Sequence, residues 1–291
     1  MADVRSILDE RNFMDKTVVL RIDSDVDVPE GGVPRSEKRL EAATESIDYI
    51  IGHGGKVILV GHFKRPDKEF QISNFKFPIS NELKRLSLKP VAEWFAKRYG
   101  GKLEEAEIDG FPAWKITDNI SLLENIRFYE GEEANDSEFS KKLASLGDMF
   151  VNEAFAVSHR KHASVYGITH YLPSYAGKHF MTEIEVLTKV MTDPDRPLVI
   201  IIGGAKIETK LPMVDAMHKI ADYILVGGEV AAHTKELIKV MHEKIEGEKA
   251  AIIVADLNDN GLNITPISVE NFIQVIQEGK TIVWNGPVGQ T

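Results

Sequence analysis

The sequence contains no cysteine, so disulfides, thiolate metal sites and a cysteine nucleophile are all excluded. No apolar run is long enough to span a bilayer, and the N-terminal segment Met1–Arg5 lacks the apolar core of a signal peptide. Basic residues are in deficit, at 35 against 45 acidic residues, which gives a formal charge of −10. This balance argues against nucleic acid or an anionic membrane as the main partner. We therefore expect a cytoplasmic protein.

Several familiar ligand-binding motifs are also missing. The spacing Gly-x-x-x-x-Gly-Lys-Ser/Thr of a Walker A loop does not occur, and no Gly-x-Gly-x-x-Gly fingerprint follows a predicted strand. A dinucleotide-dependent oxidoreductase is therefore a weak alternative. His62, His159 and His162 lack the ligand spacing of a zinc site, so we expect no protein-bound metal. We expect these histidines to form hydrogen bonds with a phosphate or a loop carbonyl.

Short apolar segments alternate with segments of helical periodicity along the whole chain. In the first half, strands are predicted at 17–22, 56–60 and 149–155, helices at 36–53, 91–99 and 138–146, and the apolar segment 120–128 carries Arg127. In the second half, strands are predicted at 198–202, 223–226, 250–254 and 281–284, and a further apolar segment lies at 269–276. Helices are predicted between the first two strands, at about 211–220, and from about Val230. This alternation indicates mostly parallel sheets covered by helices.

A domain boundary is predicted near the middle of the chain. The 291 residues suffice for two domains. Turn-forming residues at 172–177 and 193–197 flank a predicted helix at about 180–190. We interpret this helix as a connection between two α/β domains.

The join after strand 198–202 reads Gly203-Gly204-Ala205-Lys206. Small residues there allow a sharp turn and leave backbone N–H groups uncovered at a helix N-terminus, where a phosphate can bind. Lys206 and Lys210 are four residues apart, so they share one helix face and can point at the same anion. A tight turn beside two solvated lysines explains the same residues.

Charged residues gather where the predicted strands of the first half end. In parallel sheets, ligands bind outside the carboxyl ends of the strands. The residues at or just beyond these ends, together with Arg39 at the start of the first helix, are Arg21, Asp23, His62, Arg65, Arg127, His159, Arg160 and His162. Each arginine alone fits an ordinary surface role, but their shared placement indicates an anion site, because guanidinium grips phosphate and carboxylate in bidentate fashion. The acidic segment Glu130–Asp136 is predicted to be a solvated loop and helix start.

One anion site per half, with a hinge helix between them, suits phosphoryl transfer, in which positioning and charge stabilisation dominate and closure excludes water. At this level of detail the residues resemble the phosphoglycerate kinase family. Motifs similar to those of the family occur in order along nearly the whole chain, at 21–23, 38–40, 61–66, 122–128, 151–155 with 159–164, 203–206 with Lys210, and 283–287.

The resemblance implies two Rossmann-like domains with mostly parallel sheets, joined by a hinge helix, the second domain incomplete. It places a 3-phosphoglycerate domain at 1–176, a hinge helix and linker at 177–196, and a partial nucleotide-binding domain at 197–291. It also implies a monomeric glycolytic kinase that moves a phosphoryl group reversibly between 1,3-bisphosphoglycerate and MgADP, with the Mg²⁺ carried by the nucleotide. No side chain is expected to act as a covalent nucleophile, because the substrate carboxylate attacks directly.

The resemblance also assigns roles to individual positions. The residues expected to hold 3-phosphoglycerate are Asp23, Asp25, Arg39, His62, Arg65, Arg127 and Arg160. Lys206 is expected to meet the transferring phosphoryl group and Lys210 the nucleotide phosphates, so that the catalytic set is Arg39, Lys206 and Lys210. The expected nucleotide site is completed by Gly203, Gly204, Ala205, Asn285 and Pro287.

Several positions depart from the family pattern. The family reads Asp-Phe-Asn-Val-Pro where this chain has three aspartates, Asp23, Asp25 and Asp27, so the register is ambiguous and an Asp stands where an Asn contacts substrate. An extra carboxylate beside an anionic ligand is unfavourable, and Lys64, which replaces a loop glycine, could offset it. Glu229 stands where the family usually has a small or apolar residue, and the segment after it looks shorter than the family's.

The largest departure lies at the end of the chain. The family's Gly-Gly-Gly-Asp-Thr/Ser loop, which binds phosphates and Mg²⁺, has no counterpart here. From this we expect a truncated or fragmentary member with weak nucleotide binding and low or absent activity. The alternative is a non-catalytic relative that keeps the triose-phosphate site and has lost phosphoryl transfer.

Overall fold

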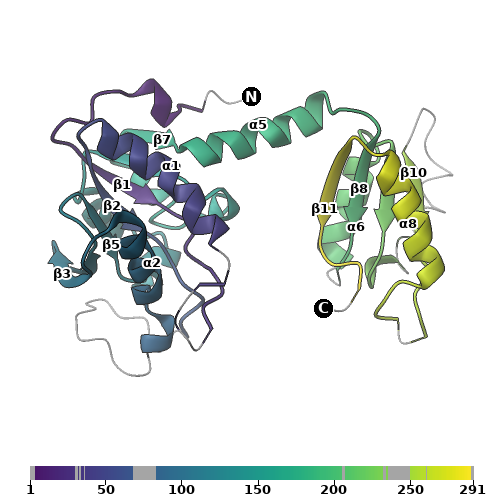
Figure 1. Cartoon of the computed structure of the whole chain (residues 1–291), viewed down its shortest axis with the longest axis horizontal. Coiled ribbons are helices and arrows are strands. Elements are labelled where there is room, and N and C mark those ends of the chain that lie inside the picture. Colours follow the sequence, from purple (N-terminus) through teal and green to yellow (C-terminus); the bar gives the residue numbers. More distant parts are fainter. Residues whose placement is uncertain are drawn as a thin grey trace. The chain divides into compact units, whose positions relative to one another are not determined.

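The computed structural model describes residues 4–29, 32, 34–35, 37–67, 83–204, 207–231, 234, 250–259 and 261–289. The chain forms two compact units, Met1–Ile184 and Glu185–Thr291 (Figure 1). Each combines helices with a sheet that is mostly or wholly parallel, which confirms the predicted α/β class. The division falls inside helix α5 (Lys178–Thr192). The domain limits at 176 and 196 stay a prediction.

The sheet of the first unit contains seven strands in the order β3-β4-β5-β2-β1-β6-β7. Their bounds are β1 Thr17–Arg21, β2 Lys56–Val60, β3 Glu104–Ile108, β4 Phe111–Lys115, β5 Ile120–Leu123, β6 Met149–Asn152 and β7 Ser174–Ala176. The five strands from β5 to β7 are parallel, whereas β3 and β4 are antiparallel. We did not predict β3 and β4. The usable signal was Asp109-Gly110, a two-residue turn in which both residues have positive φ.

The helices of the first unit are α1 (Lys38–Gly52), α2 (Lys89–Tyr99), α3 (Glu130–Glu133) and α4 (Ser137–Ala144), followed by α5. Two predicted apolar segments end earlier than expected, since β5 stops at Leu123 and β6 at Asn152. Short 3₁₀ helices follow at Ile126–Phe128 and Phe155–Val157. The reason is local: the side chains of Asn125 and Asn152 accept hydrogen bonds from the backbone N–H two residues on and replace the strand ladder.

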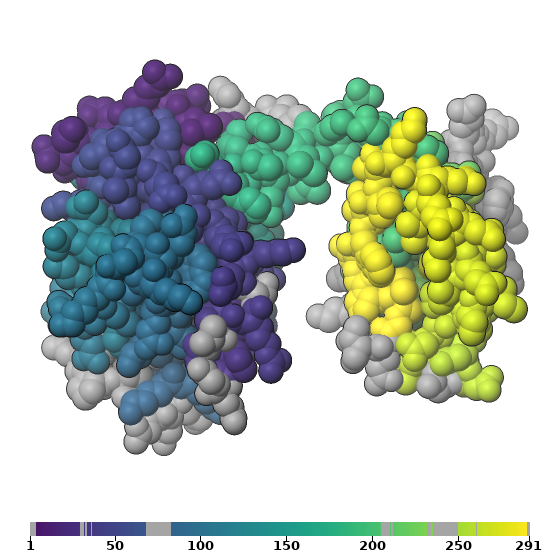
Figure 2. Space-filling view, viewed as in Figure 1, coloured from purple at the N-terminus to yellow at the C-terminus, as the bar shows by residue number. Residues whose placement is uncertain are grey.

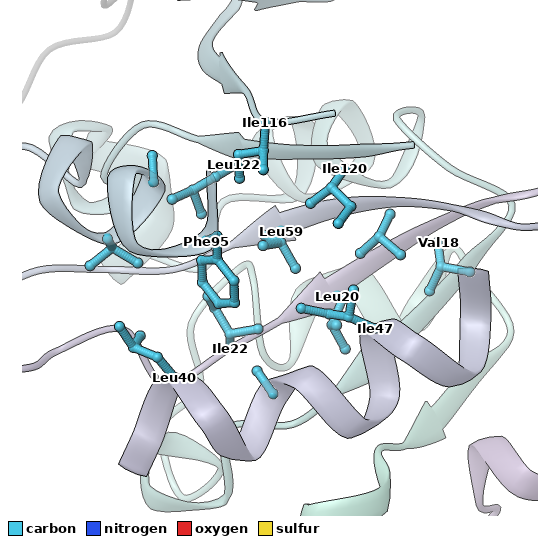
Figure 3. Close-up of a cluster of buried hydrophobic side chains, with 14 of the residues drawn as sticks. Val18, Leu20, Ile22, Leu40, Ile47, Leu59, Phe95, Ile116, Ile120 and Leu122 are labelled. Atoms are coloured by element: carbon cyan, nitrogen blue, oxygen red, sulfur yellow. The ribbon is translucent and has the colours of Figure 1, made fainter. Parts of the chain in front are cut away.

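The core of the first unit lies on both faces of its sheet. On one face, Val18 and Leu20 of β1, together with Ile22 just after it, pack with α1, β2, β5 and Phe95 of α2 (Figure 3). On the other face, Val19 and Val60 pack against a cluster that includes Phe128 and Leu143 of α4. Because β1 is buried on both sides, its continuous apolar run has no polar alternation.

The second unit has a parallel sheet in the order β10-β9-β8-β11. Its elements are β8 (Leu198–Ile202), α6 (Ile207–Met217), β9 (Tyr223–Val226), β10 (Ala251–Val254), α8 (Pro266–Glu278) and β11 (Thr281–Asn285). All of β8 is buried. Alternate residues of β8 pack with Val214 of α6 and with Phe272 of α8. The helix predicted from Val230 lies largely outside the described residues.

Strand β11 forms one edge of this sheet in the described part of the chain (Figure 1). Ile282 and Trp284 share one face of β11 and are 46% and 63% exposed. Residues of α8 and β11 lie on the visible surface of the second unit, coloured yellow in Figure 2. Charged residues and proline usually protect an edge strand against pairing with another chain, and β11 contains neither.

We therefore expect Trp284→Lys to reduce self-association at high protein concentration, measured as light scattering against concentration. The added charge on the exposed edge disfavours strand pairing between copies. Met14→Lys is a matched control, because Met14 is similarly exposed, at 65%, but lies in the first unit. An equal fall in scattering with both variants would show that general charge, and not the β11 edge, is responsible.

Candidate functional site

The carboxyl ends of four parallel strands form one edge of the first unit's sheet. The strand order β5-β2-β1-β6 changes direction between β1 and β6, which is the point where ligands bind in open α/β sheets. The segments that leave this edge contain Asp23 and Asp25 after β1, His62 and Arg65 after β2, and Arg127 after β5.

Arg21, the last residue of β1, lies at the centre of this edge and is 1% exposed. Its Nε donates to Ser164 Oγ at 3.0 Å, one terminal nitrogen donates to the carbonyl of Ile22, and the other lies 2.7 Å from His62 Nδ1. Burial lowers the pKa of Arg21 to about 10, and Glu132 and Asp23 oppose this shift. The sequence analysis placed Arg21 among the strand-end residues of the predicted anion site, but not among the residues expected to hold 3-phosphoglycerate.

His62 is held as a neutral side chain. Burial lowers its pKa to about 2, and the positive charges of Arg21, Arg127 and Arg160 lower it further. Nδ1 faces the Arg21 guanidinium, and Nε2 lies 3.7 Å from Asp25 Oδ2. His62 can therefore donate a hydrogen bond to an anion but does not add a positive charge to the site.

The shifted His62 pKa predicts a pH dependence of stability. Unfolded His62 binds a proton below pH about 6.5, whereas folded His62 stays neutral down to about 2. The unfolded state thus binds more protons, and stability falls as the pH falls through this window, by up to about 1.4 kcal/mol per pH unit. His62→Gln should reduce this slope in urea titrations between pH 4 and 6.5. The exposed His170 provides the control His170→Gln, and an equal reduction there would contradict the assignment.

Asp25 connects the loops after β1 and β2. Its carboxylate accepts a hydrogen bond from the Lys64 backbone N–H at 2.8 Å, and its carbonyl accepts one from Arg39 at 2.9 Å. Arg39 also lies 3.4 Å from Asp23. We had considered the Lys64 ammonium as an offset to the extra carboxylate, but it lies over the Phe63 ring, 5.0 Å from the centroid. Asp27 pairs instead with Arg35 at the surface.

Arg127 is positioned by Asn125, which lies at the junction of three loops. The Asn125 side chain accepts from the backbone N–H of Arg127 and donates to the carbonyls of Phe63 and Leu86 at 2.7 and 2.8 Å. Arg127 is 2% exposed and donates from one terminal nitrogen to the Lys64 carbonyl at 2.7 Å. Its Nε and other terminal nitrogen have no hydrogen-bond acceptor among the described residues, although Glu133 lies 3.3 Å from Nε.

Arg65 and Arg160 belong to the same electrostatic environment. Burial lowers the pKa of Arg127, and the charges of Arg160 and Arg65 lower it further. Arg160 likewise lowers the pKa of His62. The structure thus gathers the arginines predicted to hold an anion, and we call Arg21, Arg65, Arg127 and Arg160 the cationic cluster.

Glu132 corrects one sequence prediction. We expected the acidic segment Glu130–Asp136 to be solvated, but Glu132 is completely buried. Its carboxylate accepts from the hydroxyl of Ser164 at 2.6 Å and from the backbone N–H of Ser164 at 2.9 Å. Burial raises the pKa of Glu132, and the charge of Arg21 opposes this rise. The predicted helix start is confirmed, because α3 spans Glu130–Glu133 and Asp136 caps α4.

A cavity of about 300 Å³ adjoins this edge. Its lining includes Asp23, Arg39, Glu153 and His179. Glu153 follows β6, accepts from Ser46 at 2.6 Å, and caps the start of α5 by accepting from the backbone N–H groups of His179 and Phe180. A Cβ on Gly177 would lie 2.0 Å from the Glu153 carboxylate, so this approach requires glycine. The start of α5 is thus attached directly to the site.

In the second unit, three glycine-containing loops meet at the carboxyl ends of β8, β9 and β11. Gly203 donates to the Asn285 carbonyl at 2.9 Å, and Gly228 donates to the Val288 carbonyl at 3.0 Å. A Cβ on Gly203 would overlap the Pro287 carbonyl at 2.2 Å. Gly204 has φ +103°, and the nearest described atom to its Cβ position is Lys210 Cε at 3.8 Å. Gly203, Gly204 and Pro287 are therefore neighbours, and their assignment to a nucleotide site stays a prediction.

The Lys210 ammonium donates to the side chain of Asn285, which joins two residues that are 75 positions apart. Lys210 lies in α6 and Asn285 ends β11, so the contact brings α6 and the β11 loop together. Ala205 and Lys206 fall outside the described residues. Glu229 is exposed.

The described residues contain no group of three or more His, Asp or Glu side chains that could hold a metal ion. Within the same residues, no helix combines the length and apolar character needed to cross a membrane.

Comparison with known proteins gives a consistent result. The family model described as phosphoglycerate kinase matches residues 8–260. The phosphoglycerate kinase of Dictyoglomus turgidum is 34% identical, in a match that covers 98% of this chain and 81% of that protein. The phosphoglycerate kinase of Thermosynechococcus vestitus is 35% identical over 94% of this chain and 77% of that protein.

A solved structure supports the fold. The phosphoglycerate kinase of Coxiella burnetii superposes with a TM-score of 0.72 at 24% identity and covers 98% of this chain and 80% of that one. At this identity the likeness concerns the fold alone. The family model and the curated relatives decide the membership: the chain belongs to the phosphoglycerate kinase family.

Proposed function

We propose that this chain transfers a phosphoryl group reversibly between 1,3-bisphosphoglycerate with MgADP and 3-phosphoglycerate with MgATP. The observation that carries the proposal is the state of Arg127. This side chain is buried in the cationic cluster, yet two of its nitrogens have no hydrogen-bond acceptor among the described residues. A buried guanidinium with unused donors is costly unless an anion completes it. Because the chain belongs to the phosphoglycerate kinase family, we propose that this anion is 3-phosphoglycerate.

The acceptor substrate is proposed to bind at the sheet edge of the first unit. The side chains that would hold 3-phosphoglycerate are Asp23, Asp25, Arg39, His62, Arg65, Arg127 and Arg160. Support comes from the contacts of Arg39 with Asp23 and of Asp25 with His62. The charges of Arg160 and Arg65 also act on Arg127 and lower its pKa. His62 would contribute a neutral donor, while the arginines supply the positive charge.

The nucleotide is proposed to bind at the glycine loops of the second unit. Gly203, Gly204, Ala205, Asn285 and Pro287 would line this site, with Lys210 on the nucleotide phosphates and Lys206 on the transferring group. The open space at the Cβ position of Gly204, beside Lys210, suits the close approach of an anion. The nucleotide would bring its own Mg²⁺, which neutralises phosphate charge when bound.

The proposed chemistry needs no nucleophile from the protein. A carboxylate oxygen of 3-phosphoglycerate forms a bond to the γ-phosphorus of ATP, and the bond from that phosphorus to the bridging oxygen of ADP breaks. Arg39, Lys206 and Lys210 are the proposed catalytic cations. Their task would be to position the reactants and to stabilise charge on the transferring group, the main source of catalysis in phosphoryl transfer.

A coupled kinase assay on the 291-residue chain, with 3-phosphoglycerate and MgATP, tests the proposal. Turnover that Lys206→Ala abolishes would support it. Saturable binding of 3-phosphoglycerate without turnover would identify the non-catalytic alternative. Failure of both turnover and binding would reject the proposed function.

Replacing Arg127 with lysine should weaken 3-phosphoglycerate binding by about 1–3 kcal/mol, because the bidentate fork is lost while the charge is kept. Arg160→Lys should have an effect of the same sign. Titration calorimetry measures both affinities. Arg98→Lys is the control, since Arg98 lies on the exposed side of α2 and pairs with Asp48 of α1. Unchanged affinity in both site variants would show that the anion binds elsewhere.

We also propose that the chain acts as a cytoplasmic monomer, with its domains at 1–176 and 197–291 joined by a hinge at 177–196. The absence of cysteine and of a described membrane-spanning helix is compatible with this location.

A further inference from the structure

A chain of hydrogen bonds runs from the buried Glu132 to His62. Glu132 accepts from both the hydroxyl and the backbone N–H of Ser164. Ser164 Oγ in turn accepts from Arg21 Nε at 3.0 Å, and the far end of Arg21 lies 2.7 Å from His62 Nδ1. All four residues are buried. They come from α3, the loop after β6, the end of β1 and the loop after β2, so only the fold brings them together.

The direction of each hydrogen bond in this chain is determined by chemistry. The single Ser164 hydroxyl proton points to Glu132, which leaves a lone pair for Arg21 Nε–H. Arginine carries five donors and no acceptor, so His62 Nδ1 must accept from Arg21. A neutral imidazole whose Nδ1 accepts carries its proton on Nε2. If His62 were protonated, its Nδ1–H would point at an N–H of Arg21, and two donors would face each other without an acceptor.

We propose that Glu132 is a positioning residue, which acts through Ser164 and Arg21 to hold His62 as the Nε2–H tautomer facing the 3-phosphoglycerate site. This inference rests on the proposed function. Glu132 is fully buried and cannot touch substrate itself. Its carboxylate offsets the buried charge of Arg21, and Ser164 fixes the plane of the guanidinium. With that plane fixed, the imidazole ring has one orientation.

The consequence is a donor aimed at the ligand. His62 Nε2 lies 3.7 Å from Asp25 Oδ2, on the side of the ring away from Arg21. The pKa of His62 is lowered further by Arg127, Arg160 and His162, so its surroundings favour a neutral ring. His162 Nδ1 lies 3.7 Å from Glu132 Oε1. An anionic oxygen that enters the site would accept the Nε2–H hydrogen bond.

The test uses the ¹⁵N-labelled 291-residue chain and long-range ¹H–¹⁵N spectra of the histidine rings, with His62→Gln used to assign the His62 signals. The wild type should show only the neutral Nε2–H form of His62 between pH 6 and 8. In Glu132→Gln and in Ser164→Ala we expect a mixture of tautomers. Affinity for 3-phosphoglycerate should fall about 3- to 10-fold, which corresponds to the partial loss of one charge-assisted hydrogen bond.

Ser140→Ala is the matched control, because Ser140 is also buried in the first unit but its hydroxyl donates to the carbonyl of Asp136, the N-cap of its own helix α4. It should leave both readouts unchanged. Backbone spectra show whether each variant is folded, and Ser164→Ala keeps the test available if Glu132→Gln does not fold. A charged or Nδ1–H His62 in the wild type would overturn the proposal. So would wild-type tautomer and affinity in both variants.

The two proposals fail in different ways. If the wild type does not bind 3-phosphoglycerate, the proposed function fails, while the tautomer spectra still decide whether Glu132 and Ser164 control His62. If the substrate binds normally and the tautomer is unaffected by both variants, the proposed function stands and the positioning role of Glu132 is rejected.

Discussion

Replacing Glu124 with alanine is expected to lower the free energy of unfolding of the first unit by about 3–5 kcal/mol. Glu124 is buried and accepts four hydrogen bonds, from the Ser87 hydroxyl, the backbone N–H of Leu88 and Asn125, and the Trp114 indole, all between 2.6 and 3.0 Å. Alanine would leave four buried donors without this acceptor. Urea unfolding followed by circular dichroism measures the change.

Glu93→Ala is the matched control for Glu124. Glu93 lies on the exposed side of α2 and pairs with Lys89 only at 3.9 Å, so we expect a change within about 0.5 kcal/mol. Glu124→Gln should fall between the two, since an amide oxygen still accepts while its NH₂ meets donors. A loss below about 1 kcal/mol for Glu124→Ala would show that water replaces the carboxylate.

Phe95→Ala should also cost about 3–5 kcal/mol, because it leaves a cavity in the centre of a close-packed core. Phe95 of α2 is fully buried and lies among residues of β1, β2, β5 and α1 (Figure 3). It also contacts the Trp94 ring edge-on, with centroids 5.0 Å apart. The same urea titrations, with the slope checked for two-state behaviour, give the change.

Two companion variants make the Phe95 result specific. Phe95→Leu keeps much of the volume and should cost less than Phe95→Ala. Lys97→Ala, on the exposed side of the same helix, should change stability by less than about 0.5 kcal/mol. If Lys97→Ala were as damaging as Phe95→Ala, the loss of stability would not be specific to core packing.

Much of the fold is local in origin, which is why it could be predicted. The apolar runs of β1, β2 and β8 are buried strands, and the periodicity of Leu40, Ala43 and Ile47 marks the buried face of α1. The antiparallel pair β3 and β4 was missed because β3 is largely exposed and carries three glutamates. Such a strand is stabilised by its partner and not by its own apolar pattern.

The candidate site, too, could be predicted only in part from the sequence. The rule that ligands bind at strand carboxyl ends selected Arg127 and His62 from the sequence, and the structure places both at one edge. Their assignment to a substrate stays a proposal. The sequence could not show that Asn125 joins three loops and thereby orients Arg127, because its partners Phe63 and Leu86 are 62 and 39 residues away.

The sequence by itself determined the class of fold, the order of most helices and strands, and the residue types available at each strand end, because these depend on neighbours along the chain. Only the tertiary structure decided the state of the individual charges. Glu132 was predicted to be part of a solvated acidic segment, yet it is buried against Ser164. His62 is neutral because burial lowers its pKa and the charge of Arg21 beside its Nδ1 lowers it further. Burial and long-range partners set the protonation of such groups, and neither can be read from residues adjacent in sequence.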